Sequence, residues 1–416
     1  MLNPIVYAIP VFFGLMGLEW WIARRRGRVA FRVGDTISSV GLGAISQVSG
    51  LYSKAVTFGI YVLAYEYLRL GTLSQAHWWV WLLALLVYDF LYYWHHRLGH
   101  RVAVLWAAHV VHHQSEDFNL GTALRQTSSG FLLGWVFYLP MAIAGFPPLV
   151  FVVVALIDLL YQYWIHTEQI GKLGRFDRVF ASPSNHRVHH GVNDYCLDKN
   201  YGGILILWDR MFGSFQPELD EQVIYGTRKP LRSHDPIWAN VEVYADLAAA
   251  SWRTRRWRDK LAVWWRPPGW QPTDLAQISP YAPFVLADAR KYDPPLNPHS
   301  AIVGLLIFGL LIGFGTYCLA VVERLPLGLG LLYSGWILLA LWALARWTEA
   351  KRAAAAVLAS MLALPIPYLI FDGHSRPIES LSITLAVVLG LAALAALSLL
   401  LAPRQDSDSQ TQMELV

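Results

Sequence analysis

The stretch WWVWLLALLVYDFLYYWHHRLGHRVAVLWAAHVVHHQ, residues 78–114, combines the two features that decide the fold and the site of this chain. Its first part, as far as Trp94, is an apolar run long enough for a membrane-spanning helix. Six histidines follow between residues 95 and 113. We therefore expect a helix that leaves the membrane and continues directly into a histidine-rich polar region.

The composition of the whole chain agrees with a membrane protein. Of its 416 residues, 55% are apolar and 15% are charged, against about 25% charged residues in a typical soluble domain. This balance excludes a disordered chain, a coiled coil and an ordinary soluble protein, and a net charge of +4 gives no basic face for nucleic acid. Two cysteines, Cys196 and Cys318, are too few for a disulfide framework or a cysteine-based zinc site. The predicted class is an all-α, polytopic membrane protein.

Apolar runs divide the chain into membrane spans and a polar region. A polar region is expected at 166–300, and spans are expected at 4–23, 37–65, 78–94, 131–165, 301–322, 328–347, 353–371 and 380–402. Prolines and glycine break the run at 131–165, so we expect a helical hairpin there, and the number of spans at 37–65 and 131–165 stays open. The predicted division is N-terminal spans 1–77, a catalytic region 78–230, a cytoplasmic connecting segment 231–300, C-terminal spans 301–402 and a polar, disordered tail 403–416.

Positive charge predicts the orientation of these spans. Arginines cluster after the first span at residues 24–32, and Arg346, Lys351 and Arg352 form a second cluster. Because positive loops face the cytoplasm, the histidine-rich segments are expected on the cytoplasmic side, with an extracytoplasmic N-terminus.

The spacing of the histidines is the most informative pattern in the sequence. Residues three or four apart share one face of a helix, and such spacing recurs in three short segments. Neutral imidazoles bind transition metals well, and this number of converging rings exceeds what one ion can take, so we expect two metal ions. The candidate ligands are His96, His100, His109, His112, His113, His186, His189 and His190, with His166 as a ninth.

Other residues are expected to support the ligands or to have no part in the site. Gln162, one helical turn before His166, is a candidate amide partner. Polar residues beside the histidines are candidates for fixing imidazole tautomers, or else surface ion pairs and helix caps: Asp117, Asn119, Arg125, Asp198 and Asn200. The remaining histidines are expected to be ordinary core or surface residues: His77, His95, His234, His299 and His374.

The histidine pattern does not fit three other kinds of metal protein. The string HRLGH at 96–100 lacks the glutamate of an HExxH zinc peptidase. No ExxH pair of a soluble carboxylate di-iron site accompanies the clusters. A transporter would place its ligands at the middle of the bilayer, whereas these follow the end of a span. This placement favours an enzyme that works at the cytoplasmic surface of the membrane.

Four segments resemble the fatty acid hydroxylase and sterol desaturase superfamily of membrane di-iron enzymes, and within it the alkylglycerol monooxygenase family. They are DFLYYWHHRLGH (89–100), LWAAHVVHHQSEDFNLGTALRQ (105–126), LLYQYWIHTEQIGKLG (159–174) and SPSNHRVHHGVNDYCLDKNYGGILILWDRMFGSF (182–215). The resemblance implies that one oxygen atom from O2 is inserted next to the ether oxygen of an alkylglycerol lipid. A fatty aldehyde is then released. It also implies two iron ions held by the eight histidines of the boxes, with tetrahydrobiopterin as the electron source.

One position departs from the family pattern. Arg101 stands where the animal enzymes have a glutamate associated with activity and the pterin. The reversed charge bears on whether tetrahydrobiopterin serves this chain, and we expect Arg101 to influence which reductant is used.

The electron source and two alternative functions stay open. The sequence has neither a GxGxxG dinucleotide motif after a strand nor a CxxCH haem motif, so electrons come from a bound small reductant or a separate donor protein. The first alternative is a fatty acid or sterol hydroxylase or desaturase that uses a protein donor. The second is a non-catalytic membrane protein that binds or transports metal. The sequence leaves the oligomeric state, the lipid head group and the chain length undetermined.

Overall fold

The computed structural model describes residues 4–321, 325–365 and 379–401. Regular structure in these ranges is helical, and extended segments pair only in two isolated bridges, Phe180 with Leu205 and Gly191 with Tyr225. The predicted all-α class is confirmed. The predicted tail 403–416 lies outside the described residues, as do the ends of the spans predicted at 301–322, 353–371 and 380–402.

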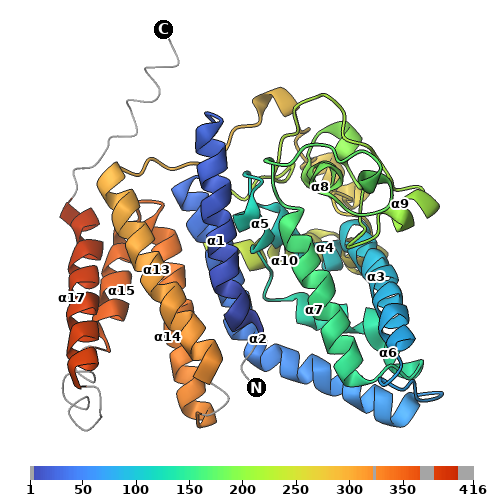
Figure 1. Cartoon of the computed structure of the whole chain (residues 1–416). Helices are drawn as coiled ribbons and strands as arrows, with labels where there is room; N and C mark the ends of the chain where they lie inside the picture. Colours follow the sequence, from blue (N-terminus) through green and yellow to red (C-terminus); the bar gives the residue numbers. More distant parts are fainter. Residues whose placement is uncertain (1–3, 322–324, 366–378, 402–416) are drawn as a thin grey trace.

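The helices form two groups that meet at α1 (Pro4–Arg25) and α2 (Val33–Leu68), as Figure 1 shows. The C-terminal group contains α13 (Pro298–Val321), α14 (Leu327–Trp347), α15 (Arg352–Ala363) and α17 (Glu379–Leu401). The other group contains α3 (Trp78–Arg101), α4 (Ala103–His113), α6 (Leu139–Ile143) and α7 (Pro148–Trp164). The long helix α2 contacts both groups, α13 and α14 on one side and α6 and α7 on the other.

Three helices of the described residues are long and apolar enough to cross a membrane: α1, α13 and α14. The spans predicted at 4–23, 301–322 and 328–347 coincide with these helices, except that residue 322 lies outside the described residues. The apolar helices α7 and α15 are shorter, with 17 and 12 residues.

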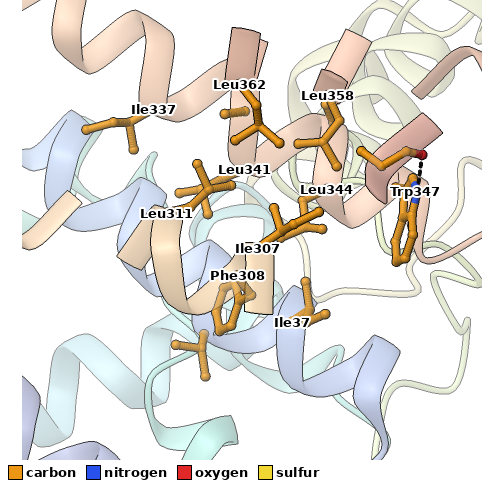
Figure 2. Packing of buried hydrophobic residues seen from close by; sticks show 14 of the residues in the cluster. Ile37, Ile307, Phe308, Leu311, Ile337, Leu341, Leu344, Trp347, Leu358 and Leu362 are labelled. Carbon is orange, nitrogen blue, oxygen red and sulfur yellow. Dashed lines mark hydrogen bonds between the residues drawn. The ribbon is translucent and has the colours of Figure 1, made fainter. Parts of the chain in front are cut away.

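The C-terminal helices pack through a continuous apolar core (Figure 2). Leu311, Leu344 and Trp347 are fully buried in it, and the indole Nε1 of Trp347 donates to the carbonyl of Ala396 at 3.2 Å. An added Cβ at Gly304 would lie 2.8 Å from the Trp347 ring, so glycine is what lets α13 and α14 approach. In lipid such close packing replaces the hydrophobic effect as the force between helices.

The apolar block at 131–165 breaks where predicted, but its two arms differ. α7 is a regular helix, whereas the preceding arm consists of two 3₁₀ segments, Gly130–Leu132 and Gly134–Tyr138, and the single turn of α6. Gly145 joins the arms with φ +92°, and a Cβ there would meet the carbonyl oxygen of Gly71 at 2.2 Å. A positive φ combined with this contact requires glycine.

The polar region consists of short helices and long connections. α8 (Pro183–His190) and α9 (Leu207–Met211) lie together at one end of the molecule, beyond α3 and α7 (Figure 1). The other α-helices of this region are α10 (Pro236–Arg253), α11 (Trp257–Trp265) and α12 (Thr273–Ile278), and the short α5 (Leu120–Ala123) precedes it in the chain. The buried carboxylate of Asp117, just before α5, links distant segments of the chain, because it accepts from Arg32 at 3.0 Å and from Lys291 at 2.6 Å.

Candidate metal centre

Three helix ends and one loop bring the histidines together. His96 and His100 lie in the last turns of α3, and α4 then returns with His109, His112 and His113. α8 is started by Ser182, whose side chain accepts from the backbone N–H of Asn185, and by Pro183 at its first position. This is the sequence signature of a helix N-terminus, so it fixes the register of the histidines that follow.

All nine predicted histidines converge, and they divide into two groups. The ligand atoms within each group lie within 4.8 Å of one another, which is the arrangement expected around one ion per group. The first group contains His96, His100, His109, His113 and His189, and the second contains His112, His166, His186 and His190. His95 belongs to neither group: its ring stacks on Phe137, 4.8 Å between centroids.

Backbone carbonyls determine the tautomer of four of these rings. Nδ1 of His96 lies 2.8 Å from the carbonyl of Tyr201, and Nδ1 of His189 lies 2.9 Å from that of Lys199. In the second group, Nδ1 of His112 and of His166 approach the carbonyls of Arg125 and Gln162 at 3.0 and 2.7 Å. A carbonyl can only accept, so each Nδ1 carries the proton and each Nε2 presents a lone pair.

These lone pairs face one another, which is the strongest geometric indication of a metal site. Nε2 of His112 and Nε2 of His166 are 3.1 Å apart, and neither has a proton to share when its ring is neutral. In the first group, Nε2 of His100 and of His189 are buried without a hydrogen-bond partner. Facing lone pairs repel unless a cation lies between them, so the donor set fits a bound transition metal in each group.

The rings are held neutral. Burial, reinforced by the neighbouring imidazoles, lowers the pKa of His109, His113 and His190 well below the usual value. Burial also lowers the pKa of His112 to about 4. Protons therefore do not fill the two groups at neutral pH, and deprotonated imidazole nitrogen is the form that ligates metal.

The polar residues predicted as partners of the histidines differ in what they contact. Arg125 and Gln162 contact ligand candidates through their carbonyls, while the Gln162 side chain lies between Tyr92 and Asp158. Asn119 caps α5. Asp117 pairs with Arg32 and Lys291. Asp198 pairs with Arg101 at 2.5 Å, and Asn200 donates to the carbonyls of Asn185 and Gln216.

Sequence reasoning missed one buried carboxylate that supports the site. Asp209 accepts from the backbone N–H groups of Tyr201 and Gly202 at 2.8 and 2.7 Å and from the Ser214 hydroxyl at 2.7 Å. It thereby fixes the peptide whose carbonyl, that of Tyr201, holds Nδ1 of His96. Only its position beside the third histidine segment distinguishes Asp209 in the sequence.

We expect Asp209→Asn to weaken metal binding by about 10–100-fold, the usual cost of losing such a supporting partner. The asparagine amide would point its own N–H toward a backbone donor and so misplace the Tyr201 carbonyl. Competition with a chelator, followed by metal analysis of the folded protein, measures the effect. Asp220→Asn, at an exposed carboxylate, is the matched control, and equal metal retention in both variants would contradict this role.

A cavity of about 330 Å³ adjoins the histidines. His96, His109, His112 and His166 contribute to one part of its lining. Most of the rest is apolar, and many of these residues come from α1, α2, α7 and α13, including Ile9, Phe12, Val48, Ala155 and Ile312. The cavity therefore combines metal-binding groups with a lining suited to an alkyl chain.

Comparison with known proteins agrees with this geometry. Residues 81–214 match the family model described as fatty acid hydroxylase. The human alkylglycerol monooxygenase is 35% identical over 389 residues, which is 92% of this chain and 86% of the relative. The alkylglycerol monooxygenases of Danio rerio and Xenopus tropicalis are 40% and 37% identical, over 73% and 80% of this chain and 68% and 74% of theirs. The chain belongs to the alkylglycerol monooxygenase family. No solved structure is significantly similar to it.

Family membership makes the chain a lipid monooxygenase. The matched hydroxylase region, 81–214, contains all nine clustered histidines. A lipid substrate and O2 fit the family, and the clusters suggest metal binding. These findings do not favour the predicted alternatives, a hydroxylase of another lipid class or a non-catalytic metal protein.

Proposed function

We propose that this chain oxidises the alkyl carbon next to the ether oxygen of alkylglycerol lipids and releases a fatty aldehyde. The observation that carries the proposal is the juxtaposition of two histidine groups with an apolar cavity. The ether-lipid substrate class is inferred from the relatives, which are alkylglycerol monooxygenases.

The nine histidines are the proposed ligands of two iron ions. When bound there, the iron pair supplies the activation of O2 that a monooxygenase requires, which zinc cannot. The rings bring no negative charge, and the carbonyls of Tyr201, Lys199, Arg125 and Gln162 hold four of them in the ligating tautomer. The protein's own contribution is to orient the nitrogens and to keep the site dry.

The proposed reaction requires a donor of two electrons. One atom of O2 becomes a hydroxyl on the carbon attached to the ether oxygen, and the other leaves as water with two protons and two electrons. In the resulting hemiacetal, the bond between the hydroxylated carbon and the former ether oxygen breaks. The glycerol part leaves as an alcohol, and the alkyl part becomes the aldehyde. Tetrahydrobiopterin is the proposed donor, with a separate donor protein as the alternative.

The cavity is proposed to hold the alkyl chain. Each buried methylene contributes about 0.8 kcal/mol, so binding needs no polar contact along the chain. Ala44 of α2 lines the cavity. We expect Ala44→Phe to raise KM for a long-chain alkyl lipid by about 50-fold, the loss of three buried methylenes, and to affect a shorter chain less.

Leu306→Phe is the control for this prediction, because Leu306 of α13 is 70% exposed on the outside of the helix bundle. Steady-state kinetics with two chain lengths measure both variants. Equal changes in KM for long and short chains would show that the alkyl chain lies elsewhere.

The site is proposed to face the cytoplasm in a multi-pass protein. Arg26, directly after α1, donates to the carbonyl of Gln169 at 2.8 Å, and Arg346, at the end of α14, pairs with Asp235 at 3.6 Å. Both positive clusters thus contact the same polar region, and positive loops are typical of the cytoplasmic side.

Arg101 is proposed to influence the reductant. It forms an ion pair with Asp198 and directly follows His100. We expect Arg101→Glu to change KM for tetrahydrobiopterin by about tenfold, or 1.4 kcal/mol, because it reverses a charge beside the metal site. Asp198→Asn removes the ion pair without adding a carboxylate and is the control. Unchanged pterin dependence in Arg101→Glu would show that this position does not determine the reductant.

The experiment that tests the function is aldehyde release from an alkyl-lysophospholipid by iron-replete membranes containing this chain. Reactions with and without tetrahydrobiopterin are compared. Pterin-dependent aldehyde supports the whole proposal. An iron-loaded protein that releases no aldehyde, either with tetrahydrobiopterin or with the electron donors of the membranes alone, would contradict the ether-lipid substrate.

A further inference from the structure

Two helices of the polar region expose apolar faces. On α10, Ile237, Val241 and Trp252 are exposed, and their spacing of four and eleven residues places them along one side of the helix. On α11, Trp257, Leu261 and Trp265 follow one another at intervals of four, so they also share a face. Trp252, Trp257 and Leu261 are 86%, 81% and 72% exposed.

The opposite faces of these helices are packed against the catalytic region. Ala239 of α10 is buried with Leu42 of α2 and Val111 of α4. α11 is joined to the start of α4, where the N–H of Ala103 donates to the carbonyl of Arg266 at 3.0 Å. α10 and α11, together called the α10–α11 hairpin, are therefore already packed against the rest of the protein through one side. Their apolar face points away from those contacts.

Positive charge borders this apolar face. Between residues 251 and 270 the sequence contains six basic residues and one acidic residue, Asp259, which pairs with Arg256 at 3.0 Å. The basic residues are Arg253, Arg255, Arg256, Arg258, Lys260 and Arg266. The same twenty residues contain five tryptophans. Exposed tryptophan bordered by arginine is the composition of helices that lie in the headgroup region of a membrane.

We propose that the α10–α11 hairpin lies flat on the bilayer, with its apolar face among the acyl chains and its arginines on the headgroup phosphates. A bilayer is the occupant that this chain necessarily meets, because it has helices long and apolar enough to cross one. The hairpin also contacts the cavity: Tyr244 of α10 lines it, and its hydroxyl donates to Ser129 at 3.1 Å. The hairpin thus connects the membrane surface with the lipid cavity.

This proposal does not depend on the metal or on the ether substrate. It changes the interpretation of residues 231–300, predicted as a cytoplasmic connecting segment, because part of this segment becomes a second attachment to the membrane. Because its arginines lower the mean hydropathy, the α10–α11 hairpin is not detected as a membrane span from the sequence.

Site-directed spin labelling in lipid nanodiscs tests the proposal on the full chain. A nitroxide is placed on Trp257→Cys or Leu261→Cys, since both natural cysteines are buried and resist labelling. Collision rates with O2, which concentrates in lipid, and with a water-soluble nickel chelate are compared. Leu306→Cys on α13 is the lipid-facing reference, and Asp220→Cys, at a fully exposed side chain, is the water-facing reference.

We expect the O2-to-nickel ratio at positions 257 and 261 to lie within about twofold of that at 306, because apolar faces of such helices insert to the acyl boundary. A ratio like that at 220 would overturn the proposal. Low collision rates with both reagents would also overturn it, because they would show that another protein covers this face.

Discussion

His189→Ala is expected to abolish turnover while the protein stays folded in the membrane. The Nε2 atom of His189 is buried and has no hydrogen-bond partner, while its Nδ1 is fixed by the Lys199 carbonyl. Loss of a supporting residue alone costs about 10–100-fold, so removal of a direct ligand is expected to lower kcat by more than about 100-fold. The variant should also retain less metal in the first group, which metal analysis of the purified protein measures.

His77→Ala is the matched control for this variant. His77 is an exposed histidine at the start of α3, outside both groups, and its removal should leave activity and metal content unchanged. Full activity in a metal-analysed His189→Ala sample would contradict the assignment of His189 as a ligand.

Replacement of iron by zinc is expected to remove activity altogether without disturbing the structure. The nine nitrogens would accept zinc, because imidazole is a good ligand for it. Zinc cannot exchange electrons with O2, so turnover should fall to the background of metal-free protein. Thermal unfolding should nevertheless occur at a higher temperature than in the metal-free protein, because any metal bound to the folded state stabilises it.

Activity and thermal stability of the zinc form together show whether lipid oxidation requires a redox-active metal. A zinc protein that is stabilised and inactive, beside an active iron protein, is the expected result. Equal lipid oxidation by the zinc and iron forms would show that redox chemistry at the histidine groups is not required.

The sequence predicted that the nine histidines would converge, because helix geometry fixes which side chains share a face. It did not predict how the nine divide between two groups. His112 and His113 are neighbours in the chain but belong to different groups, as do His189 and His190. Adjacent residues point about 100° apart on a helix, so each pair reaches two sites, but the direction depends on how α4 and α8 pack.

The supporting contacts were less predictable, for a physical reason. Four imidazoles are oriented by backbone carbonyls, and every residue has one, so no side chain marks Tyr201 or Lys199 as a partner. Asp209 acts one step further away, through the peptide at 201–202. The contact between His96 and Tyr201 exists only after the third histidine segment has folded against α3.

The sequence also predicted only some of the membrane-associated helices. Hydropathy identified α1, α13 and α14, whose apolar character is intrinsic to the helix. It did not reveal that the first arm of 131–165 forms short 3₁₀ segments. Nor did it identify α10 and α11, where apolar and basic residues alternate with helical period and average out in a hydropathy window.

The most direct test of the central claim is the origin of the oxygen in the product. The iron-loaded protein is given an alkyl-lysophospholipid, a reductant and ¹⁸O₂, and the aldehyde is reduced to the alcohol as it forms, before it exchanges oxygen with water. Mass spectrometry then measures the label. The proposed reaction places one ¹⁸O atom in the fatty alcohol, with none when His189 is alanine. An unlabelled alcohol formed at the same rate would show that water, not O2, supplies the oxygen, and would contradict the monooxygenase site described above.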